Sequence, residues 1–452
     1  MWLRKFTIAF IFLPVFINAQ DDYSRLLDQY MSSQASINDF SGNVLIAYKG
    51  KIIYKKALGY ANREWKIPNT LETKFRIGSI TKQFTSAAIL QLVEKGKISL
   101  EDKLSNYFPA FPKGDSVTIH MLLNHTCGIK SYTAIKNFSS ISPLPYSKDS
   151  VIALISRQPY DFSPGTSYSY SNSGYFLLGC LVEKVSGQSY ESYLNENLIN
   201  SVSLRNTGMD RLDSILPNRS SGYVLSQRVY KNAPFISMEF PFSAGAIFST
   251  VDDIYKWQMA LFGGKIVSGE HLKKMNTPYL SKYGYGLHID TFHNHLHIGH
   301  SGGIPGYTTN SEYYPADDLY IIVFSNNTAD APYIGKALAS IIFEVPVVQP
   351  YKHKEVEIDG KLLDKYVGRY RTSDGTIINL VKKENKLFRR TESGVEFEFA
   401  PESNSKFFAL NGRDNQVEFF IDKNGYVVKV EFIRSGVRTE MRKVIQETAL
   451  KN

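Results

Sequence analysis

The order of apolar patterns along the chain restricts its fold more than any other feature of the sequence. Two β-branched runs flank Lys49-Gly50-Lys51, which predicts a β-hairpin over residues 42–62. Apolar residues then recur at helical spacing in the segments 79–95, 151–156, 174–186 and 252–262. Strand patterns return at 296–300, 308–314 and 319–325, followed by a helical pattern at 333–345. We expect an α/β fold in which both ends of this region build one sheet, with helical segments between them.

The composition and the apolar pattern of the sequence change at "VPVVQPYKHKEVEID", residues 345–359. Its two prolines and its charged residues are typical of a linker, which we expect to be open to proteolysis. Short alternating runs follow, separated by turns such as Ser373-Asp374-Gly375 and Lys423-Asn424-Gly425. This spacing predicts a small antiparallel barrel or sandwich. The predicted division is therefore an α/β domain at 20–345, a linker at 346–354 and an all-β domain at 355–452.

The first residues of the chain have the pattern of an export signal. "MWLRK" provides positive charge, "FTIAFIFLPVFI" provides a short apolar run, and "INA" provides small residues for cleavage after Ala19. The apolar run is short for a bilayer span, which needs about 20 residues. An uncleaved anchor is the alternative interpretation. We expect an exported protein, periplasmic or secreted, with residues 1–19 removed and no stable membrane anchor.

Charge and cysteine content leave several properties open. The formal net charge is +9, and the basic residues are spread along the chain rather than clustered. This indicates either a solvated surface or attraction to anionic envelope polymers, and no motif for nucleic-acid binding accompanies it. The two cysteines, Cys127 and Cys180, could pair in an oxidising compartment, but the sequence does not decide whether they meet. The oligomeric state is equally undetermined.

The stretch "FRIGSITKQF" places Ser79 and Lys82 one helical turn apart. A serine hydroxyl becomes a good nucleophile when a base takes its proton, and a buried lysine with a lowered pKa can be that base. Gly78 permits a tight turn before the helix, and the N–H of Ser79 at the helix N-terminus could stabilise an oxyanion. The alternative is an ordinary helix N-cap. The same spacing recurs at Ser403 and Lys406 in a predicted loop, so the motif alone is weak evidence.

A second candidate motif is Tyr170-Ser171-Asn172, within "FSPGTSYSYSNSGYFLLG". A tyrosine beside a cationic lysine can become a phenolate and carry a proton to a leaving group. The amide of Asn172 can contact a substrate carbonyl and Lys82. The pattern Tyr-x-Asn also occurs at Tyr60, Tyr193 and Tyr230, but only Tyr170 lies in a Gly/Ser-rich loop that leads into an apolar helix.

A third candidate motif is "HIGHSGGIPGYTTN", which follows a strand pattern. Gly302 allows close approach to the backbone, and the Gly303 N–H could be a second oxyanion donor. His300 is either a substrate contact or an ordinary polar residue at a strand end. The nearby His293-x-His295-x-His297 alternation lacks an adjacent carboxylate, so we expect neither a metal site there nor any other cofactor.

Taken together, the three motifs resemble those of the serine β-lactamase and penicillin-binding protein superfamily in their order and spacing. The tyrosine in the second motif points to the class C β-lactamase-like branch, which includes D-alanyl-D-alanine carboxypeptidases, D-aminopeptidases and esterases. "LLNHTCGI" and "SAGAIFSTVDDIYKW" also look like this branch, and the resemblance covers about residues 25–345. It implies an antiparallel sheet flanked by helices with a helical subdomain. The strand-rich tail resembles the lipocalin-like domains attached to such hydrolases.

The resemblance also implies roles for individual residues. In the catalytic group, Ser79 would be the nucleophile, with Lys82 and Tyr170 as coupled base and acid. Substrate would be bound by Asn172, His300, Ser301 and Gly302. The oxyanion would be stabilised by the N–H groups of Ser79 and Gly303. Two positions depart from the family pattern: His300 replaces the usual lysine, and Cys127 replaces the usual serine of "HTSG". We hypothesise that a protonated His300 meets a substrate carboxylate, although its charge is weaker at neutral pH.

The function implied is an exported serine hydrolase that acts through an acyl-enzyme. Its expected substrates are D-amino-acid peptides or related amides and esters, in the manner of a penicillin-binding protein or a D-alanyl-D-alanine carboxypeptidase. One alternative is an esterase or weak β-lactamase using the same site. Another is an inactive protein that senses muropeptides. The expected partners are small peptide, amide or ester molecules, for which the cell wall is one candidate source, and no nucleic acid.

Overall fold

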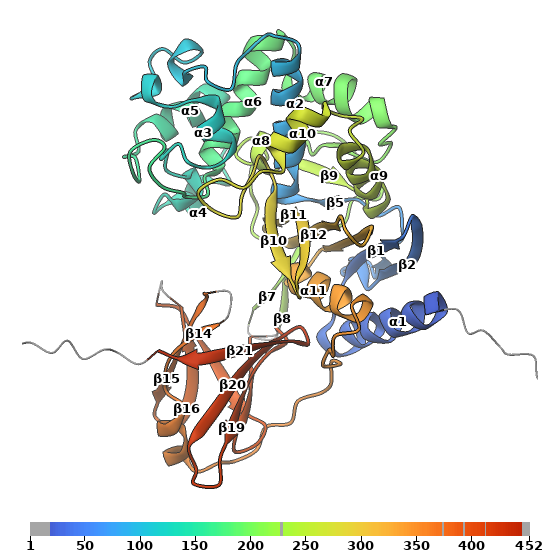
Figure 1. The fold of residues 1–452 in the computed structure, drawn as a ribbon, viewed down its shortest axis with the longest axis vertical. Helices are drawn as coiled ribbons and strands as arrows, with labels where there is room; N and C mark the ends of the chain where they lie inside the picture. The colour runs from blue at the N-terminus through green and yellow to red at the C-terminus, as the bar shows by residue number, and fades with distance from the viewer. Residues whose placement is uncertain (1–18, 227–228, 373–374, 392–393, 412, 445–452) are drawn as a thin grey trace, which may run out of the picture.

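A computed structural model describes residues 19–226, 229–372, 375–391, 394–411 and 413–444 (Figure 1). Residues 1–18 of the expected export signal lie outside these ranges, and the first helix, α1, begins at Ala19. Among the described residues, no helix combines the length and the apolar character that a membrane crossing requires.

The centre of the molecule is a six-stranded antiparallel sheet in the order β10-β11-β12-β13-β1-β2. Its strands are β1 Gly42–Tyr48, β2 Lys51–Leu58, β10 His288–Phe292, β11 His295–Ile304, β12 Tyr307–Tyr314 and β13 Leu319–Ser325. Strand β1 pairs with β13, with Val44 opposite Val323. The two ends of the α/β region therefore meet in one sheet, which confirms the predicted fold class.

Each face of this sheet belongs to a different apolar core, because successive side chains of a strand point to opposite sides. Val44 and Ile46 of β1 pack against α1 (Ala19–Asn38) and α11 (Ala331–Ile342). Leu45 and Ala47 join the larger core, which α2, α6 and α9 also build. All seven residues of β13 are buried, as expected for a strand covered on both faces.

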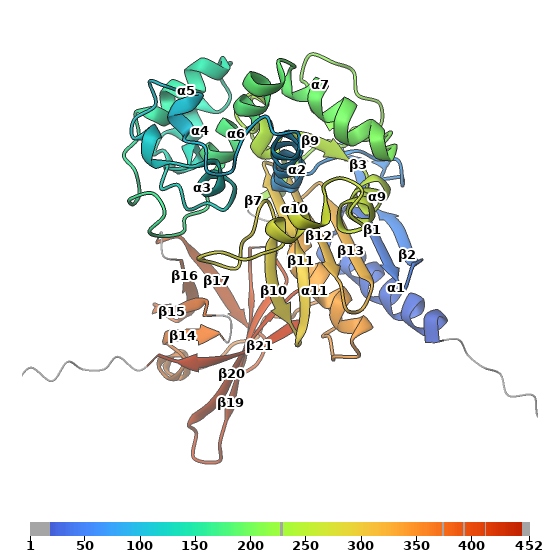
Figure 2. The same cartoon turned by 45° about the horizontal axis from the view of Figure 1, so that its top comes forward.

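A helical region lies at one end of the sheet, at the top of Figure 1 and Figure 2. Its helices, together with those beside the sheet, are α2 Thr81–Glu94, α3 Ile119–Leu123, α4 Phe138–Ile141, α5 Lys148–Ser156, α6 Asn172–Ser186, α7 Tyr190–Leu194, α8 Phe242–Gly245, α9 Val251–Phe262 and α10 Gly269–Met275. Helix α6 packs against both α2 and α8. This packing brings the start of α6 next to the start of α2.

Three small sheets connect these parts. They are β3 Tyr60–Asn62 with β4 Ile67–Pro68, then β5 Phe75–Arg76 with β9 Ile247–Ser249 and β6 Gly208–Met209, and the hairpin β7 Tyr223–Ser226 with β8 Val229–Asn232. Strand β5 leads directly into the turn that contains Ser79. The sequence did not predict these short strands.

The C-terminal part is a closed antiparallel barrel in which each strand pairs with the next and β14 closes on β21. Its strands are β14 Gly368–Thr372, β15 Ile377–Lys383, β16 Lys386–Arg390, β17 Glu396–Pro401, β18 Lys406–Ala409, β19 Asn415–Ile421, β20 Val427–Arg434 and β21 Val437–Lys443. The barrel, orange to red in Figure 1, lies at the opposite end of the molecule from the helical region. The predicted barrel is confirmed, and β21 is the strand that the sequence pattern missed.

The expected linker follows the surface of the barrel instead of hanging free. The Val348 N–H donates to the Gly436 carbonyl (3.0 Å), and the Tyr351 hydroxyl donates to Glu402 (2.7 Å). These contacts favour a segment held against the barrel over an open spacer at residues 346–354. We propose the same division into domains at 20–345 and 355–452, with this segment as a strap between them.

The turn between β20 and β21 docks the barrel onto the sheet. Val437 is 5% exposed and belongs to the core formed by α1 and α11. The Tyr30 hydroxyl donates to the Ser435 carbonyl (2.7 Å), and Arg434 pairs with Asp330 while lying 3.9 Å above the Tyr333 ring. One turn of the barrel thus completes a core of the α/β region.

The two cysteines are both buried and free. Burial raises the pKa of each thiol to about 12, so neither is a reactive thiolate near neutral pH. Cys127 lies beside Gly174 of α6, where its sulfur would be 3.8 Å from an added Cβ. The structure gives no further account of its departure from the family pattern.

Candidate active site

Ser79 lies in a 3₁₀ turn, Gly78–Ile80, immediately before α2. Gly78 has φ +53°, and a Cβ there would lie 2.8 Å from the Gly303 nitrogen of β11. Only glycine combines this backbone conformation with so close a contact. The turn is fixed from behind, because the Thr309 hydroxyl donates to the Ile77 carbonyl (2.9 Å). Ser79 is consequently held at a helix N-terminus, beside the backbone of β11.

Lys82 is fully buried, and its nitrogen has three close neighbours. Lys82 Nζ lies 2.9 Å from Ser79 Oγ, 2.9 Å from Asn172 Oδ1 and 2.7 Å from the Ala244 carbonyl oxygen. Burial lowers the pKa of Lys82 well below its ordinary value, which favours the neutral amine. A neutral amine has two N–H donors and one lone pair. Since the oxygens of Asn172 and Ala244 can only accept, the lone pair is left for the Ser79 hydroxyl.

The amide of Asn172 is oriented by a neighbouring loop. Its Nδ2 donates to Thr133 Oγ1 (3.3 Å), while its main-chain N–H donates to Ser131 Oγ (3.2 Å). These contacts leave the amide oxygen facing Lys82. The structure therefore brings Ser79, Lys82 and Asn172 together, as the motifs predicted. The contribution of Thr133 was missed, because an isolated threonine in a loop carries no signal in the sequence.

Tyr170 completes the cluster, with its ring centre 4.8 Å from Lys82 Nζ. Burial raises the pKa of Tyr170 well above its ordinary value, and the Ser79 side chain offsets this only in part. The phenolate expected from the sequence therefore does not suit this environment, which favours the neutral phenol. In the described part of the chain, the hydroxyl is buried without a hydrogen-bond partner of ordinary geometry.

The His125 ring packs against the Tyr170 ring. The ring centres are 4.4 Å apart, and the Ser171 N–H donates to His125 Nδ1 (3.2 Å). Burial lowers the pKa of His125 well below its ordinary value, with Lys82 and His300 adding to the effect. A neutral imidazole therefore packs under Tyr170. The family phrase "LLNHTCGI" contained this histidine, but no role for it followed from the sequence.

His300 lies on β11 and is 2% exposed. Its Nδ1 donates to the Ser301 carbonyl (2.5 Å), and its Nε2 accepts from the Tyr283 hydroxyl (3.0 Å). Burial, the neighbouring His288 and Lys82 hold the pKa of His300 well below its usual range. The hypothesis that a protonated His300 meets a substrate carboxylate is therefore wrong for this structure. Both ring nitrogens are occupied within the protein, and burial favours the neutral ring.

The two glycines after Ser301 have different surroundings. A Cβ on Gly302 would lie 2.0 Å from the Ile77 carbonyl oxygen and 2.3 Å from Thr309 Oγ1. Gly302 thus serves close packing of the chain against the Ser79 turn, not approach by a ligand. A Cβ on Gly303 would meet no atom within 4 Å, because Gly303 borders a cavity. Ser301 is half-buried and pairs with Asn310 in the sheet.

A cavity of about 430 Å³ opens beside Ser79. Its lining residues are Ser79, Tyr132, Thr133, Phe138, Ser139, Ser142, Pro143, Asn172, Pro234, Phe235, Ile236, Pro241, Ala244, Gly245, Gly303, Ile304 and Pro305. The size is in the range of small-molecule sites. Among these lining residues of the described chain none is charged, and most side chains are apolar. The lining thus includes Ser79, Asn172 and Gly303, three residues of the candidate site.

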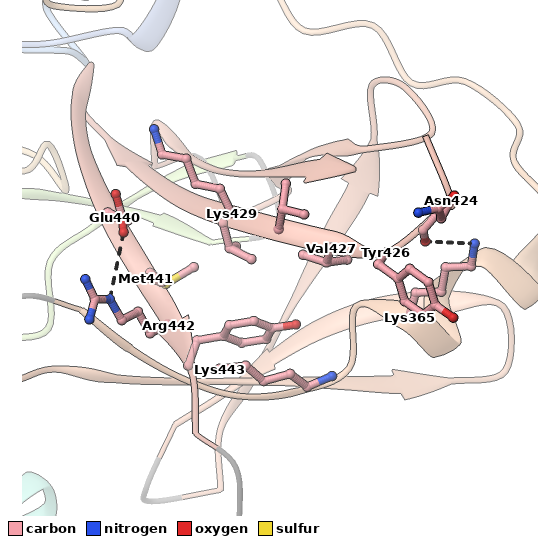
Figure 3. Close-up of a pocket in the computed structure, with 13 residues that line it drawn as sticks. Lys365, Asn424, Tyr426, Val427, Lys429, Glu440, Met441, Arg442 and Lys443 are labelled. Carbon is pink, nitrogen blue, oxygen red and sulfur yellow. Dashed lines mark hydrogen bonds and ion pairs between the residues drawn. The ribbon is translucent and has the colours of Figure 1, made fainter. Parts of the chain in front are cut away.

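A second cavity, of about 700 Å³, lies on the barrel where β20 and β21 separate (Figure 3). Lys365, Lys429, Arg442 and Lys443 line it, together with Glu440. Lys429 is paired with Glu431, and Lys365 donates to the Gly425 carbonyl. No serine, cysteine or histidine is among the described lining residues. This cavity is larger than the one beside Ser79, but its described lining residues offer no nucleophile of these types.

The alternating histidines of the β10–β11 hairpin pair with carboxylates. His295 Nδ1 lies 2.8 Å from Asp317, and His297 Nδ1 lies 2.8 Å from Glu312. His293 is in the turn, with φ +48°. Within the residues that the structure describes, no group of three or more His, Cys, Asp or Glu side chains is arranged to hold a metal.

Comparison of the sequence and the fold with known proteins places the chain in a family. The beta-lactamase family model matches residues 25–341. A penicillin-binding protein of Bacillus subtilis (strain 168) is 29% identical over 416 residues, 86% of this chain and 91% of that protein. The teichoic acid D-alanine hydrolase of Staphylococcus aureus (strain MRSA252) is 25% identical over 315 residues, 69% of this chain and 75% of that protein. The octameric penicillin-binding protein homologue of Pyrococcus abyssi superposes with a TM-score of 0.66 at 27% identity, covering 92% of this chain and 99% of that one.

Proposed function

The chain belongs to the beta-lactamase family of serine hydrolases, and from this premise we propose that it is an exported enzyme that cleaves amides or esters through an acyl-enzyme on Ser79. The observation that carries the proposal is the environment of Lys82. Its amine is buried, its two N–H groups face acceptors, and its lone pair faces the Ser79 hydroxyl. This arrangement is that of a base prepared to accept a proton.

In the proposed acylation, Lys82 takes the proton of Ser79 as Oγ forms a bond to the substrate carbonyl carbon. The N–H groups of Ser79 and Gly303 stabilise the oxyanion; the close approach of Gly78 to the Gly303 nitrogen supports this pairing. The proton passes by way of the neutral Tyr170 hydroxyl to the leaving group as the scissile bond breaks. Water then attacks the acyl-enzyme with the same groups in reverse order, which releases the acid and restores Ser79.

Four residues position these groups or the substrate. Asn172 holds Lys82 and offers its amide edge to the cavity. His300, Ser301 and Gly302 keep β11 in place behind the Ser79 turn: His300 through Tyr283, and Gly302 through its contact with Ile77. We assign His300 a positioning role in place of the charged contact that the sequence suggested.

The substrate class follows from the relatives and from the motifs. One relative is named for hydrolysing D-alanine of teichoic acid and another for binding penicillin. Their names support D-amino-acid peptides, or related amides and esters, as substrates of this chain. The export-signal pattern expected at residues 1–19 favours action outside the cytoplasm, and sequencing the N-terminus of the exported protein would test cleavage after Ala19.

Covalent labelling tests the proposal directly. A fluorophosphonate probe and a fluorescent penicillin should label the protein, and Ser79→Ala should abolish labelling and lower kcat by at least ~10³-fold. Ser403→Ala is the matched control, because Ser403 also precedes a lysine by three residues but lies in the barrel. Labelling that survives in Ser79→Ala would refute the nucleophile. Binding of a muropeptide without any turnover would favour the sensor interpretation instead.

A further inference from the structure

The walls of the cavity beside Ser79 come from three chain segments: 132–143, 234–241 and 304–305. Most of the lining residues in these segments are apolar or aromatic, among them Phe138, Phe235, Ile236 and Ile304. Such a surface stabilises a bound group in proportion to the apolar area that leaves water. Its composition therefore carries information about the group that it receives.

The walls are also held in place. The Ser237 N–H donates to the Ser142 carbonyl (2.8 Å), which ties the second segment to the first. Gly306, with φ +81°, packs so closely that an added Cβ would lie 2.6 Å from Ala233 Cβ. This contact ties the third segment to the second. These contacts restrain the walls, which lowers the entropic cost of ordering them around a ligand.

No fixed positive charge serves this cavity. None of its described lining residues is charged, Lys82 is held toward the neutral amine, and His300 is buried with both nitrogens occupied. A carboxylate moved from water into such surroundings loses its hydration without gaining a partner. Charged substrate groups are therefore disfavoured beside Ser79.

The position of the cavity relative to Tyr170 indicates which part of the substrate it receives. Ser79, Gly303 and Asn172 line the cavity, whereas Tyr170 does not. In the proposed mechanism, Tyr170 protonates the leaving group, which must lie on its side of the reacting carbonyl. The acyl part then extends in the other direction, along Asn172 and into the apolar walls.

We propose that this enzyme selects substrates whose acyl part carries an uncharged, apolar or aromatic side chain, and that it discriminates against an acyl side chain with a carboxylate. This specificity rests on the proposed function, because it assigns the acyl subsite of that same reaction. Phe235 is the main determinant that can be changed safely. Its side chain is 58% exposed at the edge of the cavity, so its replacement should not disturb the core.

Two matched pairs of substrates test the proposal with the full-length enzyme. N-acetyl-D-phenylalanine methyl ester should exceed N-acetyl-D-alanine methyl ester in kcat/KM by at least ~10-fold. N-acetyl-D-glutamine α-methyl ester should exceed the corresponding glutamate ester, which differs in charge but hardly in shape, by a similar factor. Equal values within both pairs, or a preference for glutamate, would overturn the proposal.

Variants separate the wall from the catalytic groups. Phe235→Ala should reduce the preference for the phenylalanine ester over the alanine ester several-fold, and Phe235→Lys should raise kcat/KM for the glutamate ester relative to the glutamine ester. Trp65→Ala, which removes an aromatic side chain that is 81% exposed elsewhere, should change neither preference. If every protein is labelled at Ser79 but the Phe235 variants keep the wild-type preferences, the specificity assignment is wrong and the proposed function stands. If the wild-type enzyme is neither labelled nor active, both fail.

Discussion

The amine nitrogen of Lys82 lies 2.7 Å from the main-chain oxygen of Ala244, in the short helix α8. A carbonyl oxygen can only accept a hydrogen bond. One N–H of Lys82 therefore donates to it whether the amine is neutral or protonated. The Asn172 amide oxygen accepts a second N–H of the amine. The direction of the lone pair toward Ser79 is therefore a consequence of the fold, and several predictions depend on it.

Lys82→Arg should inactivate the enzyme although it keeps a long basic side chain. A guanidinium stays protonated and cannot accept the Ser79 proton. We expect kcat/KM for an ester to fall by at least ~10³-fold, measured together with the rate of fluorophosphonate labelling. A circular dichroism spectrum like that of the wild type would show that the fold is kept. Near-normal activity in this variant would exclude Lys82 as the base.

Asn172→Asp should move the pH dependence of acylation. The substitution places a carboxylate about where Oδ1 now lies, 2.9 Å from Lys82 Nζ, and a negative charge there raises the pKa of the amine. At pH 7 kcat/KM should fall by at least ~10-fold and should recover as the pH is raised and Lys82 deprotonates. A full profile from pH 6 to 10 for both proteins measures this. A uniform loss at every pH would mean that Asn172 acts on the substrate alone.

Gly302→Ala and Gly303→Ala should separate stability from activity. In Gly302→Ala the new methyl collides with the Ile77 carbonyl oxygen, so the free energy of unfolding should fall by about 1–3 kcal/mol or more. In Gly303→Ala the methyl enters open space at the edge of the cavity, so stability should be nearly unchanged while KM rises. Urea unfolding and steady-state kinetics on both variants provide the test. The reverse pattern would show that the cavity is not the substrate site.

Acid should destabilise the protein before most carboxylates titrate. The pKa values of His125, His288 and His300 are lowered, chiefly by burial, so the unfolded chain binds protons more readily than the folded one. Stability is then lost as the pH falls below about 6.5, at up to about 1.4 kcal/mol per pH unit for each such histidine. Urea titrations at pH 5.5, 6.5 and 7.5 measure this loss, and His300→Gln should make it shallower.

His297 provides the control with the opposite sign. Burial works against its protonation, but the carboxylate of Glu312 outweighs that effect and raises the pKa of His297. Its contribution to stability is present below about pH 6.5 and is lost as the pH rises through its folded pKa. Accordingly, His297→Gln should make the acid loss of stability steeper, and a shallower loss would contradict the assignment.

The docking of the barrel predicts that the two parts unfold together. Val437→Asp would bury an unpaired carboxylate in the core of α1 and α11, and should cost about 3 kcal/mol or more. Val428 lies on the same hairpin, but its side chain is 65% exposed. The control substitution Val428→Asp should therefore change the free energy of unfolding by less than about 0.5 kcal/mol. Limited proteolysis of the native protein should spare residues 346–354. Two separate unfolding transitions in the wild type would refute this coupling.

Much of the fold was predictable because its longest elements carry clear periodicity. The helix at 79–95 was expected, and α2 with the turn before it occupies Gly78–Glu94. Strand β21, Val437–Lys443, was missed because charged residues at four of its seven positions hide the alternation. Only two of its side chains, those of Val437 and Met441, are buried. The short strands beside Ser79 have too few residues to show any period.

The candidate site was predictable in part for a similar reason. Ser79 and Lys82 are local in sequence, so helix geometry alone relates them, and the family resemblance supplied Tyr170 and Asn172. The state of His300 was not predictable, because it depends on Tyr283 and His288, which the sheet brings to it from another strand and loop. The pKa of His300 is lowered chiefly by burial, and a sequence motif does not report burial.

The contact between Tyr30 and Ser435 has a consequence for biosynthesis. The two residues are 405 positions apart, and at 5–20 residues per second a ribosome would need roughly 20–80 s to synthesise the chain between them. During that interval the apolar face of α1 lacks a partner that the finished molecule supplies from the β20–β21 turn. Mutations in that distant turn could therefore reduce the yield of folded enzyme by prolonging the exposure of α1 to chaperones and proteases, even when every group around Ser79 is intact.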